Sequence, residues 1–410
     1  MNAAAAAEAA ARSSYGRLLA WLAWQWRDVA AAEDALADAF AAALERWPVD
    51  GVPEAPDAWL LTAARRRLLM AARRQRLADD PTLTVLWPGE HAAAPDVAPL
   101  PDARLRLLFV CAHPAIDAGV HSALMLQTVL GLDAARIASA FLVKPEAMTK
   151  RLVRAKAKIR DAGLRFEEPG ADEWPERVAS VLEAIYGAYT LHWGLADDAD
   201  AGELAGEARF LAELVAKQLP AEPEALGLVA LLWLCEARRP ARHDAFQPLH
   251  EQDPQAWDAS LIAQADAALH RAAAHRAPGP FQLEAAIQAA HVQGRLHGHV
   301  PWDGITRLHE RLLEIAPTVG ARIAHAVALA HAGPDARAGL RLLDAIEPER
   351  IAAHQPWWAA RAHLLVMAGL HDEASAAYGR ALALTVEPRL RAWMTRRLQA
   401  EQAVAARSAG

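Results

Sequence analysis

The 410-residue sequence is poor in cysteine and has no long uncharged apolar run. Its two cysteines, Cys111 and Cys235, lie far apart and neither belongs to a CxxC pair, so we predict two buried small apolar groups without a disulfide framework or a cysteine zinc site. No segment approaches the roughly 20 apolar residues that span a bilayer, and the N-terminus lacks a basic leader followed by an apolar core. We therefore expect a cytoplasmic protein that does not enter a membrane.

Sequence patterns of common enzymes are also lacking. We find no P-loop, no glycine pattern for dinucleotides, no HExxH and no GxSxG. Three of the 17 histidines, His291, His297 and His299, lie close together, but a metal site usually includes a carboxylate or thiolate and needs convergent geometry. We predict a protein that is not an enzyme and that holds no metal and no cofactor.

The fold class follows from the rarity of β-branched runs. Ala, Leu, Arg and Glu dominate, and apolar residues recur at three- and four-residue spacing, which predicts an all-α protein. Helical periodicity disappears in the stretch rich in Pro and Asp at residues 79–101, and a weaker boundary lies near residues 167–175. We predict a first helical domain at residues 1–78, a linker at 79–101, a second small domain at 102–168 and a helical extension at 174–410.

The net charge of -7 is distributed unevenly. Residues 1–168 hold 21 Lys and Arg against 20 Asp and Glu, whereas the remainder holds 22 against 30. Every charge between Asp57 and Leu77 is basic, and acidic residues gather upstream at Glu33, Asp34, Asp38 and Glu45. This separation indicates an acidic surface for a protein partner and basic surfaces for phosphate groups.

Residues 115–160 have the pattern of a helix-turn-helix. We predict a helix at 122–130 that ends at Gly131, a short helix capped by Asp133, and a longer helix that opens at Pro145. On that last helix, spacings of four, three and four predict one buried stripe: Met148, Leu152, Ala155 and Ile159. The candidate DNA-binding cations are Lys144, Lys150, Arg151, Arg154 and Lys158. The alternative is a solvated basic helix in a bundle.

A second basic helix begins at Pro56 and Asp57. It combines an aromatic residue with several cations, as suits melted DNA, whose bases stack and whose phosphates need neutralising. The candidate DNA-binding residues are Trp59, Arg65, Arg66, Arg73, Arg74 and Arg76. Arginine-rich helices also occur as ordinary surface helices, so this element alone does not establish DNA binding.

The last hundred residues carry a faint repeat. Residues 356–382 place small and aromatic residues where a helix-turn-helix repeat of the tetratricopeptide type needs them: Ala362, Gly369, Ala374, Tyr378 and Ala381. Residues 327–346, with Gly333 at the turn, resemble a degenerate preceding unit. Stacked repeats create a binding face, so we expect a protein or peptide partner for this extension. An irregular helical bundle is the alternative.

Taken in order, these segments resemble the extracytoplasmic-function class of RNA polymerase sigma factors. AEDALADAF, residues 32–40, is similar to that family's polymerase-docking helix, which implies that Asp34, Asp38 and Phe40 bind core RNA polymerase. AWLLTAARRRLLMAARRQR resembles its promoter-melting helix, and RIASAF and KRLVRAKAKIR resemble its reader of the upstream promoter element. Further segments resemble a subgroup with a tetratricopeptide-like extension: LRLLFVCAHPAI, PLHEQDPQAWD, GPFQLEAAIQAAH and AAYGRALAL.

The resemblance implies a sigma factor whose partners are core polymerase and promoter DNA. Some positions depart from the family pattern: Arg66 stands where Asn is usual, Met70 where Asp is usual, Ala37 where Gln is common and Arg136 where Glu is frequent. These departures bear on promoter preference more than on polymerase binding. The alternatives are a helix-turn-helix transcription regulator that does not recruit polymerase, and an interaction scaffold whose basic helices are incidental.

Overall fold

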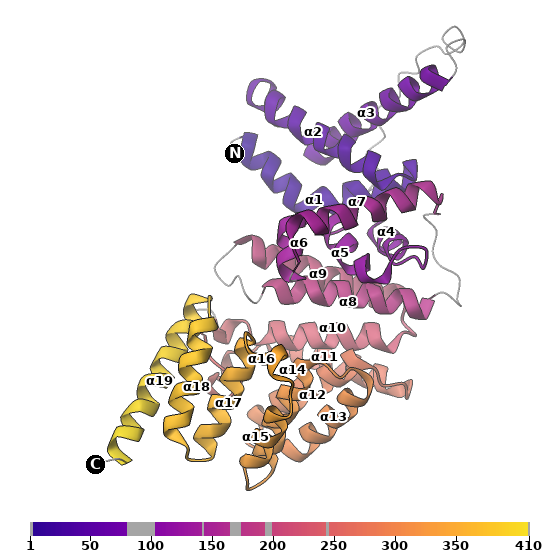
Figure 1. The fold of residues 1–410 in the computed structure, drawn as a ribbon. Helices are drawn as coiled ribbons and strands as arrows, with labels where there is room; N and C mark the ends of the chain where they lie inside the picture. Colours follow the sequence, from indigo (N-terminus) through magenta and orange to yellow (C-terminus); the bar gives the residue numbers. More distant parts are fainter. Residues whose placement is uncertain are drawn as a thin grey trace. The chain divides into compact units, whose positions relative to one another are not determined.

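The computed structural model describes residues 3–79, 103–141, 143–164, 174–192, 199–242 and 246–408. Within these ranges every regular element is a helix (Figure 1), which confirms the all-α prediction. The chain packs as two compact units, Met1–Leu211 and Ala212–Gly410. The predicted linker falls almost entirely on residues 80–102, which lie outside the described ranges.

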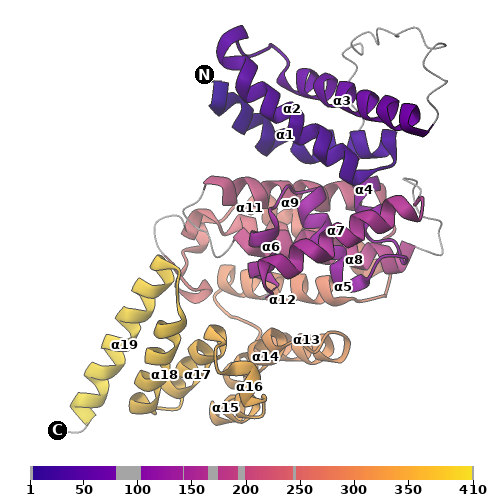
Figure 2. The same ribbon diagram turned by 45° about the horizontal axis from the view of Figure 1, so that its top comes forward.

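The N-terminal unit opens with three long helices that lie side by side (Figures 1 and 2): α1 (Ala3–Trp26), α2 (Val29–Asp50) and α3 (Pro56–Asp79). Asp28 begins α2 by accepting a hydrogen bond of 3.0 Å from the Ala31 amide, which satisfies one of the free N–H groups of the first turn. Apolar residues from all three helices are fully buried between them, among them Leu18, Leu36 and Leu60.

Four shorter helices follow: α4 (Arg104–Cys111), α5 (Ala118–Thr128), α6 (Ala134–Ala140) and α7 (Pro145–Asp161). Helix α5 begins at Ala118, four residues earlier than predicted, because the Asp117 side chain accepts a hydrogen bond from the Gly119 amide and caps the helix. The predicted short helix after Asp133 and the predicted start of the last helix at Pro145 are both present.

Two helices of the predicted extension belong in whole or part to this same unit. Helix α8 (Trp174–His192) packs against α5, and His121 Nδ1 lies 3.3 Å from Ser180 Oγ across that contact. Helix α9 (Ala199–Gln218) spans the unit boundary at Leu211. The division into domains at 1–78, 102–168 and 174–410 stays a prediction, since the packing joins described parts of all three in one unit.

A close backbone approach joins the first three helices to the next four. A Cβ at Gly16 of α1 would lie 1.9 Å from the Val129 carbonyl oxygen, just after α5, so only glycine fits there. Gly131, at φ +68°, allows the chain to turn after α5, and its own Cβ position would lie 3.2 Å from the Tyr15 ring. Residues 3–79 and 103–164 are therefore closely packed, although the sequence suggested separate domains.

The C-terminal unit is a series of helical pairs. After α10 (Pro223–Ala237), three 3₁₀ turns, η2 (Pro240–Arg242), η3 (Leu249–Glu251) and η4 (Pro254–Ala256), lead into α11 (Ala259–Ala274), α12 (Pro280–Leu296), α13 (Trp302–Ile315), α14 (Val319–Ala332), α15 (Arg337–Asp344), α16 (Pro348–Ile351), α17 (Gln355–Met367), α18 (His371–Leu384) and α19 (Pro388–Ser408). Glu224 of α10 caps α12 from outside by accepting hydrogen bonds from the Phe281 and Gln282 amides.

The five small or aromatic positions of the proposed repeat lie where a helical hairpin requires them. Ala362 of α17 and Ala374, Tyr378 and Ala381 of α18 are buried, and Gly369 takes a φ of +73° in the turn. Gly333 likewise ends α14 before the turn to α15. Helices α17, α18 and α19 lie side by side in both ribbon views (Figures 1 and 2). The hairpins are therefore present, and their assignment to the tetratricopeptide type stays a prediction.

Both cysteines are free and buried, as predicted. No helix within the described ranges has the length and apolarity needed to cross a bilayer. Among the same residues, no three or more His, Cys, Asp or Glu side chains are arranged to hold a metal ion.

Candidate nucleic-acid interface

The turn between α6 and α7 positions the candidate recognition helix. The Asp133 carboxylate accepts hydrogen bonds of 2.9 Å from the amides of Ala135 and Arg136, which fixes the start of α6. Pro145 stands in the first turn of α7, where the missing N–H costs nothing and the fixed φ favours the helix. The side chain of Leu142, between them, lies outside the described residues. The local sequence thus determines both helices and the short turn that joins them.

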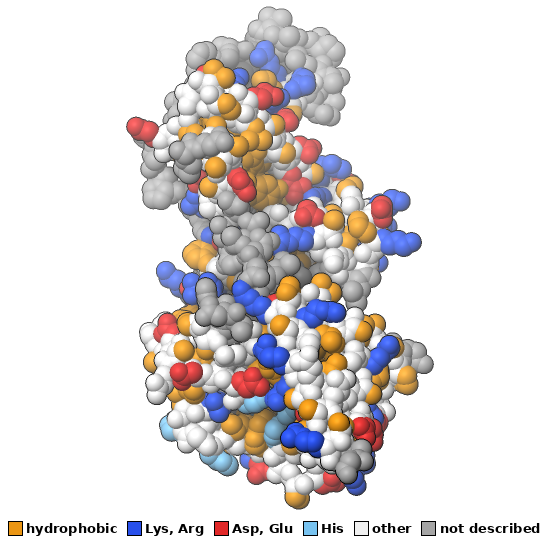
Figure 3. All heavy atoms as spheres, turned by 90° about the vertical axis from the view of Figure 1, so that its left-hand side faces the viewer, with side chains coloured by type: hydrophobic (Ala, Val, Ile, Leu, Met, Phe, Trp, Pro, Cys, Tyr) orange, Lys and Arg blue, Asp and Glu red, His pale blue; other side chains and the backbone are white. Residues whose placement is uncertain are grey.

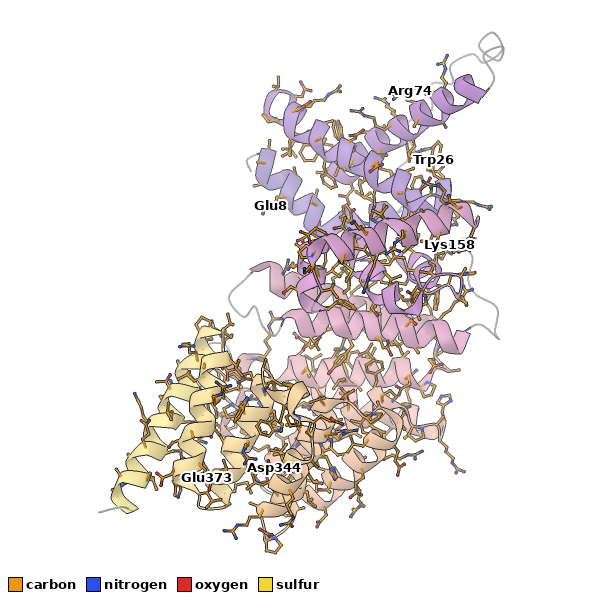
Figure 4. All side chains as sticks on the ribbon, in the orientation of Figure 1. Glu8, Trp26, Arg74, Lys158, Asp344 and Glu373 are labelled. Carbon is orange, nitrogen blue, oxygen red and sulfur yellow. The ribbon has the colours of Figure 1, made fainter. Side chains whose placement is uncertain are left out.

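Helix α7 has one apolar face and one cationic face. The predicted stripe of Met148, Leu152, Ala155 and Ile159 is buried, each residue being at most 5% exposed. The candidate cations are exposed: Lys144, Lys150, Arg151, Arg154 and Lys158. Figure 4 labels Lys158 near the C-terminal end of α7. A helix anchored on one side with a row of cations on the other has the form required for the major groove, with phosphates held by its later cations.

One lysine of α7 is turned inward. Lys156 is 9% exposed and pairs with the Glu33 carboxylate of α2, which is itself largely buried. Burial raises the pKa of Glu33 above its usual range, and the neighbouring Lys156 ammonium opposes that rise. The same burial raises the pKa of the adjacent Cys111 thiol to about 12, so this thiol is inert at neutral pH. The pair is a structural contact between α2 and α7.

The cations of α3 differ in their surroundings. Arg66, Arg73 and Arg74 are exposed, and Figure 4 shows Arg74 extending from the distal half of the helix. Arg65 is half-buried, with its guanidinium 5.6 Å from the centre of the Trp21 ring. The side chain of Arg76 lies outside the described residues. The exposed arginines can neutralise phosphates, whereas Arg65 also holds α3 to α1.

Trp59 is half-buried at the start of α3. Its ring meets the buried Trp47 edge to face at 5.6 Å. About three turns further on, Met70 is 51% exposed and Leu69 is 46% exposed, although both are large and apolar. The outer side of α3 therefore offers apolar surface among its arginines, the combination that can stack and hold unpaired bases.

The predicted polymerase-docking residues lie on α2. Asp34 and Asp38 are exposed, and Phe40 is half-buried. Asp38 lies 3.5 Å from Arg67 of α3, in an ion pair whose two side chains are both about half exposed. Such an exposed pair contributes about 0–1 kcal/mol, so it leaves Asp38 available to a partner. Leu44, further along the same helix, is large and apolar and is 52% exposed.

Three of these contacts have no direct sign in the sequence. Lys156 follows Leu152 by four residues and precedes Ile159 by three, so its place on the buried side of α7 could have been found from spacing. Its partner Glu33 could not, because 123 residues separate the two. Arg65 with Trp21, and Asp38 with Arg67, likewise depend on how the helices pack.

Comparison with known proteins agrees with this geometry. Sigma-70 region 2 matches residues 11–78, and a family of unknown function, DUF6596, matches residues 177–273. An uncharacterized protein of Rhizobium meliloti (strain 1021) is 36% identical over 373 residues, which cover 88% of this chain and 87% of that protein. No solved structure matches the chain. Helices α1, α2 and α3 contain the segment that matches sigma-70 region 2, and the chain belongs to the same family as the Rhizobium meliloti protein.

Proposed function

We propose that this protein is an RNA polymerase sigma factor that directs promoter-specific initiation of transcription in the cytoplasm. The observation that carries the proposal is the exposed row of cations on α7, opposite a buried stripe, in a chain that opens with a sigma-70 region 2 domain. Two separate DNA-contacting helices on a protein that binds polymerase can specify a promoter through contacts that are weak individually. Its chemistry is recognition rather than catalysis.

Each element takes one task. Helix α2 docks on core polymerase through Asp34, Asp38 and Phe40. Helix α3 faces the downstream promoter element with its exposed arginines and Trp59, and α7 reads the upstream element with Lys150, Arg151 and Arg154. The order of the segments supports the extracytoplasmic-function class, and the helical hairpins of the C-terminal unit support a tetratricopeptide-like extension that binds a protein or peptide.

A binding experiment with two matched variants tests both tasks. We expect Arg151→Ala/Arg154→Ala to lose affinity for promoter duplexes at least tenfold and to reduce the salt dependence of binding, because two phosphate or base contacts are removed. Arg271→Ala/Arg307→Ala removes the same charge from exposed positions of the C-terminal unit and should bind DNA as the wild type does. All three proteins should still pull down core polymerase.

The outcomes separate the candidate functions. DNA binding that depends on Arg151 and Arg154, without capture of polymerase, would identify a helix-turn-helix regulator that acts without recruiting polymerase. Equal DNA affinity in the two double variants would contradict the role of α7 and would favour a scaffold.

A further inference from the structure

Four histidines from four different elements lie together in the C-terminal unit: His250 of η3, His291 of α12, His331 of α14 and His363 of α17. We call them the histidine cluster. His331 Nε2 and His363 Nε2 are 2.9 Å apart, so one ring donates its hydrogen to the other. The His250 ring lies 6.4 Å from that of His363. Histidine side chains gather on the face of this unit that Figure 3 shows.

An aromatic residue holds the cluster in place. Trp302 of α13 stacks on His331 with ring centres 4.2 Å apart and planes within 11°. It also meets His291 edge to face at 5.2 Å. These contacts restrain the orientation of two imidazoles, and a restrained donor loses less freedom when it binds a ligand. The cluster is thus pre-organised, although its residues are up to 113 positions apart in the chain.

Arginines surround the cluster. Arg397 of α19 and Arg295 of α12 act electrostatically on His250, Arg397 also acts on His363, and Arg238 of α10 acts on His291. The carboxylate that acts on these rings in the described part of the chain is Glu251, which lies 3.6 Å from His250 and 3.2 Å from Arg397. Three guanidinium groups against one carboxylate leave the surroundings positive while the histidines are neutral.

Two of these arginines have an N–H group that makes no hydrogen bond within the described residues. Arg295 donates to the Gln252 carbonyl oxygen and Arg397 to the Glu251 carboxylate, but the Nε–H group of each arginine is buried without an acceptor among the described residues. A buried N–H group without an acceptor is destabilising, so unused donors beside a positive cluster point to an anionic ligand. Gln252, which is 3% exposed, also has a buried Oε1 without a donor there, which could accept from a ligand hydroxyl.

The imidazoles are held neutral. Burial lowers the pKa of His291 and His363 to about 4, and it also lowers the pKa of His250 and His331. The neighbouring arginines and histidines lower these pKa values further. Glu251 opposes the shift at His250. His309 of α13 acts on His291 in the same direction. An anion placed against these rings would favour their protonated forms and provide them with an acceptor.

We propose that the histidine cluster, with Arg295 and Arg397, is a binding site for an oxyanion of the phosphate type, and that binding is accompanied by uptake of a proton. The bound group would accept hydrogen bonds from the His331 and His363 pair and from the two guanidinium groups. The ligand is inorganic phosphate or a phosphate monoester. This inference does not depend on the proposed sigma-factor function, since it concerns contacts inside the C-terminal unit alone.

The experiment measures anion binding by the full chain with isothermal titration calorimetry. Sulfate is the first probe because it keeps its charge between pH 5.5 and 8, so any pH dependence belongs to the protein. We expect saturable sulfate binding that strengthens by up to about tenfold per pH unit as the pH falls, with proton uptake detected by comparing buffers of different ionisation enthalpy. Inorganic phosphate and glycerol 1-phosphate then distinguish the free anion from the monoester, whichever binds more tightly.

Two variants and a control keep the test sharp. His363→Asn and Arg397→Gln should each weaken sulfate binding at least tenfold, and the first should also reduce proton uptake. His275→Asn/Arg307→Gln removes the same kinds of group from exposed positions of the unit and should bind as the wild type does. Folding of each variant is checked by circular dichroism. Three outcomes would each overturn the proposal. Sulfate could bind no more strongly than chloride at equal ionic strength, or the two single variants could bind sulfate as tightly as the wild type does. The third is saturable binding of Zn²⁺ without saturable binding of sulfate.

Discussion

Gly16 of α1 lies directly against the backbone at the end of α5. Its missing Cβ leaves room for the Val129 carbonyl group, and backbone atoms cannot yield as a flexible side chain can. We expect Gly16→Ala to lower the free energy of unfolding by about 1–3 kcal/mol or more, through overpacking. Gly187→Ala is the control, since nothing lies within 4 Å of its Cβ position and alanine favours a helix. Urea unfolding measures both, and equal midpoints would contradict the packing of α1 against the end of α5.

The Glu33 and Lys156 pair makes a second prediction at the residue scale. Lys156→Met leaves the Glu33 carboxylate without its partner in a largely buried place, which costs roughly 3–5 kcal/mol when both groups are well buried. Glu33→Gln/Lys156→Met should recover much of that loss, because no uncompensated charge remains. Lys150→Met, on the exposed side of the same helix, should change stability by no more than about 0.5 kcal/mol. A double variant as unstable as Lys156→Met would show that the charge balance is not the cause.

Single helices were the part of the fold that the sequence predicted best. The stripe on α7 and the Asp133 cap depend on residues a few positions apart, so periodicity and capping rules were enough to find them. The observed start of α5 lies four residues before the predicted one, because its cap, Asp117, stands five residues before residue 122, where the predicted helix begins. Contacts between elements, such as Arg65 with Trp21 or His331 with His363, depend on how the helices pack, and this packing cannot be predicted from short-range sequence patterns.

Helix α3 makes a prediction at the element scale. Arg73 and Arg74 are exposed, whereas Arg65 also contacts Trp21. If α3 faces melted promoter DNA, Arg73→Ala/Arg74→Ala should slow open-complex formation, seen as reduced permanganate reactivity of unpaired thymines, without changing stability by more than about 0.5 kcal/mol. Arg65→Ala should lower stability by about 0.5–1 kcal/mol through the lost contact with Trp21. Unchanged promoter opening in the double variant would argue that α3 serves only the fold.

The stability of the C-terminal unit should depend on pH. Burial lowers the pKa of His309 to about 4, and His309 is only 6% exposed. Below about pH 6.5 the His309 side chain is protonated in the unfolded chain but stays neutral in the folded one. The stability that the neutral, buried His309 provides is therefore complete above about pH 6.5 and is lost as the pH falls toward 4. In that window His309 alone should account for up to about 1.4 kcal/mol per pH unit. His309→Gln should flatten the dependence measured by urea unfolding, and an unchanged slope would contradict the assignment.

At the scale of the whole molecule, one chain combines a segment that matches sigma-70 region 2, the two helices of the predicted helix-turn-helix and a helical extension. The all-α class was predictable because helical periodicity runs through nearly every segment. The two compact units were not, since their boundary at Leu211 lies inside α9 and has no sign in the composition. The histidine cluster was not predictable either, because its four members lie far apart in the sequence and only His291 stands in a group of nearby histidines.

The proposed function requires that this protein directs polymerase to promoters through an acidic docking face on α2. The most direct test is promoter-specific transcription in vitro with core polymerase, comparing the wild type with Asp34→Ala/Asp38→Ala and with the control Asp50→Ala/Glu54→Ala, which removes the same charge from exposed positions nearby. We expect specific transcripts with the wild type and the control and their loss with the first variant. An absence of specific transcripts from any genomic promoter fragment, while the protein still binds duplex DNA, would contradict it.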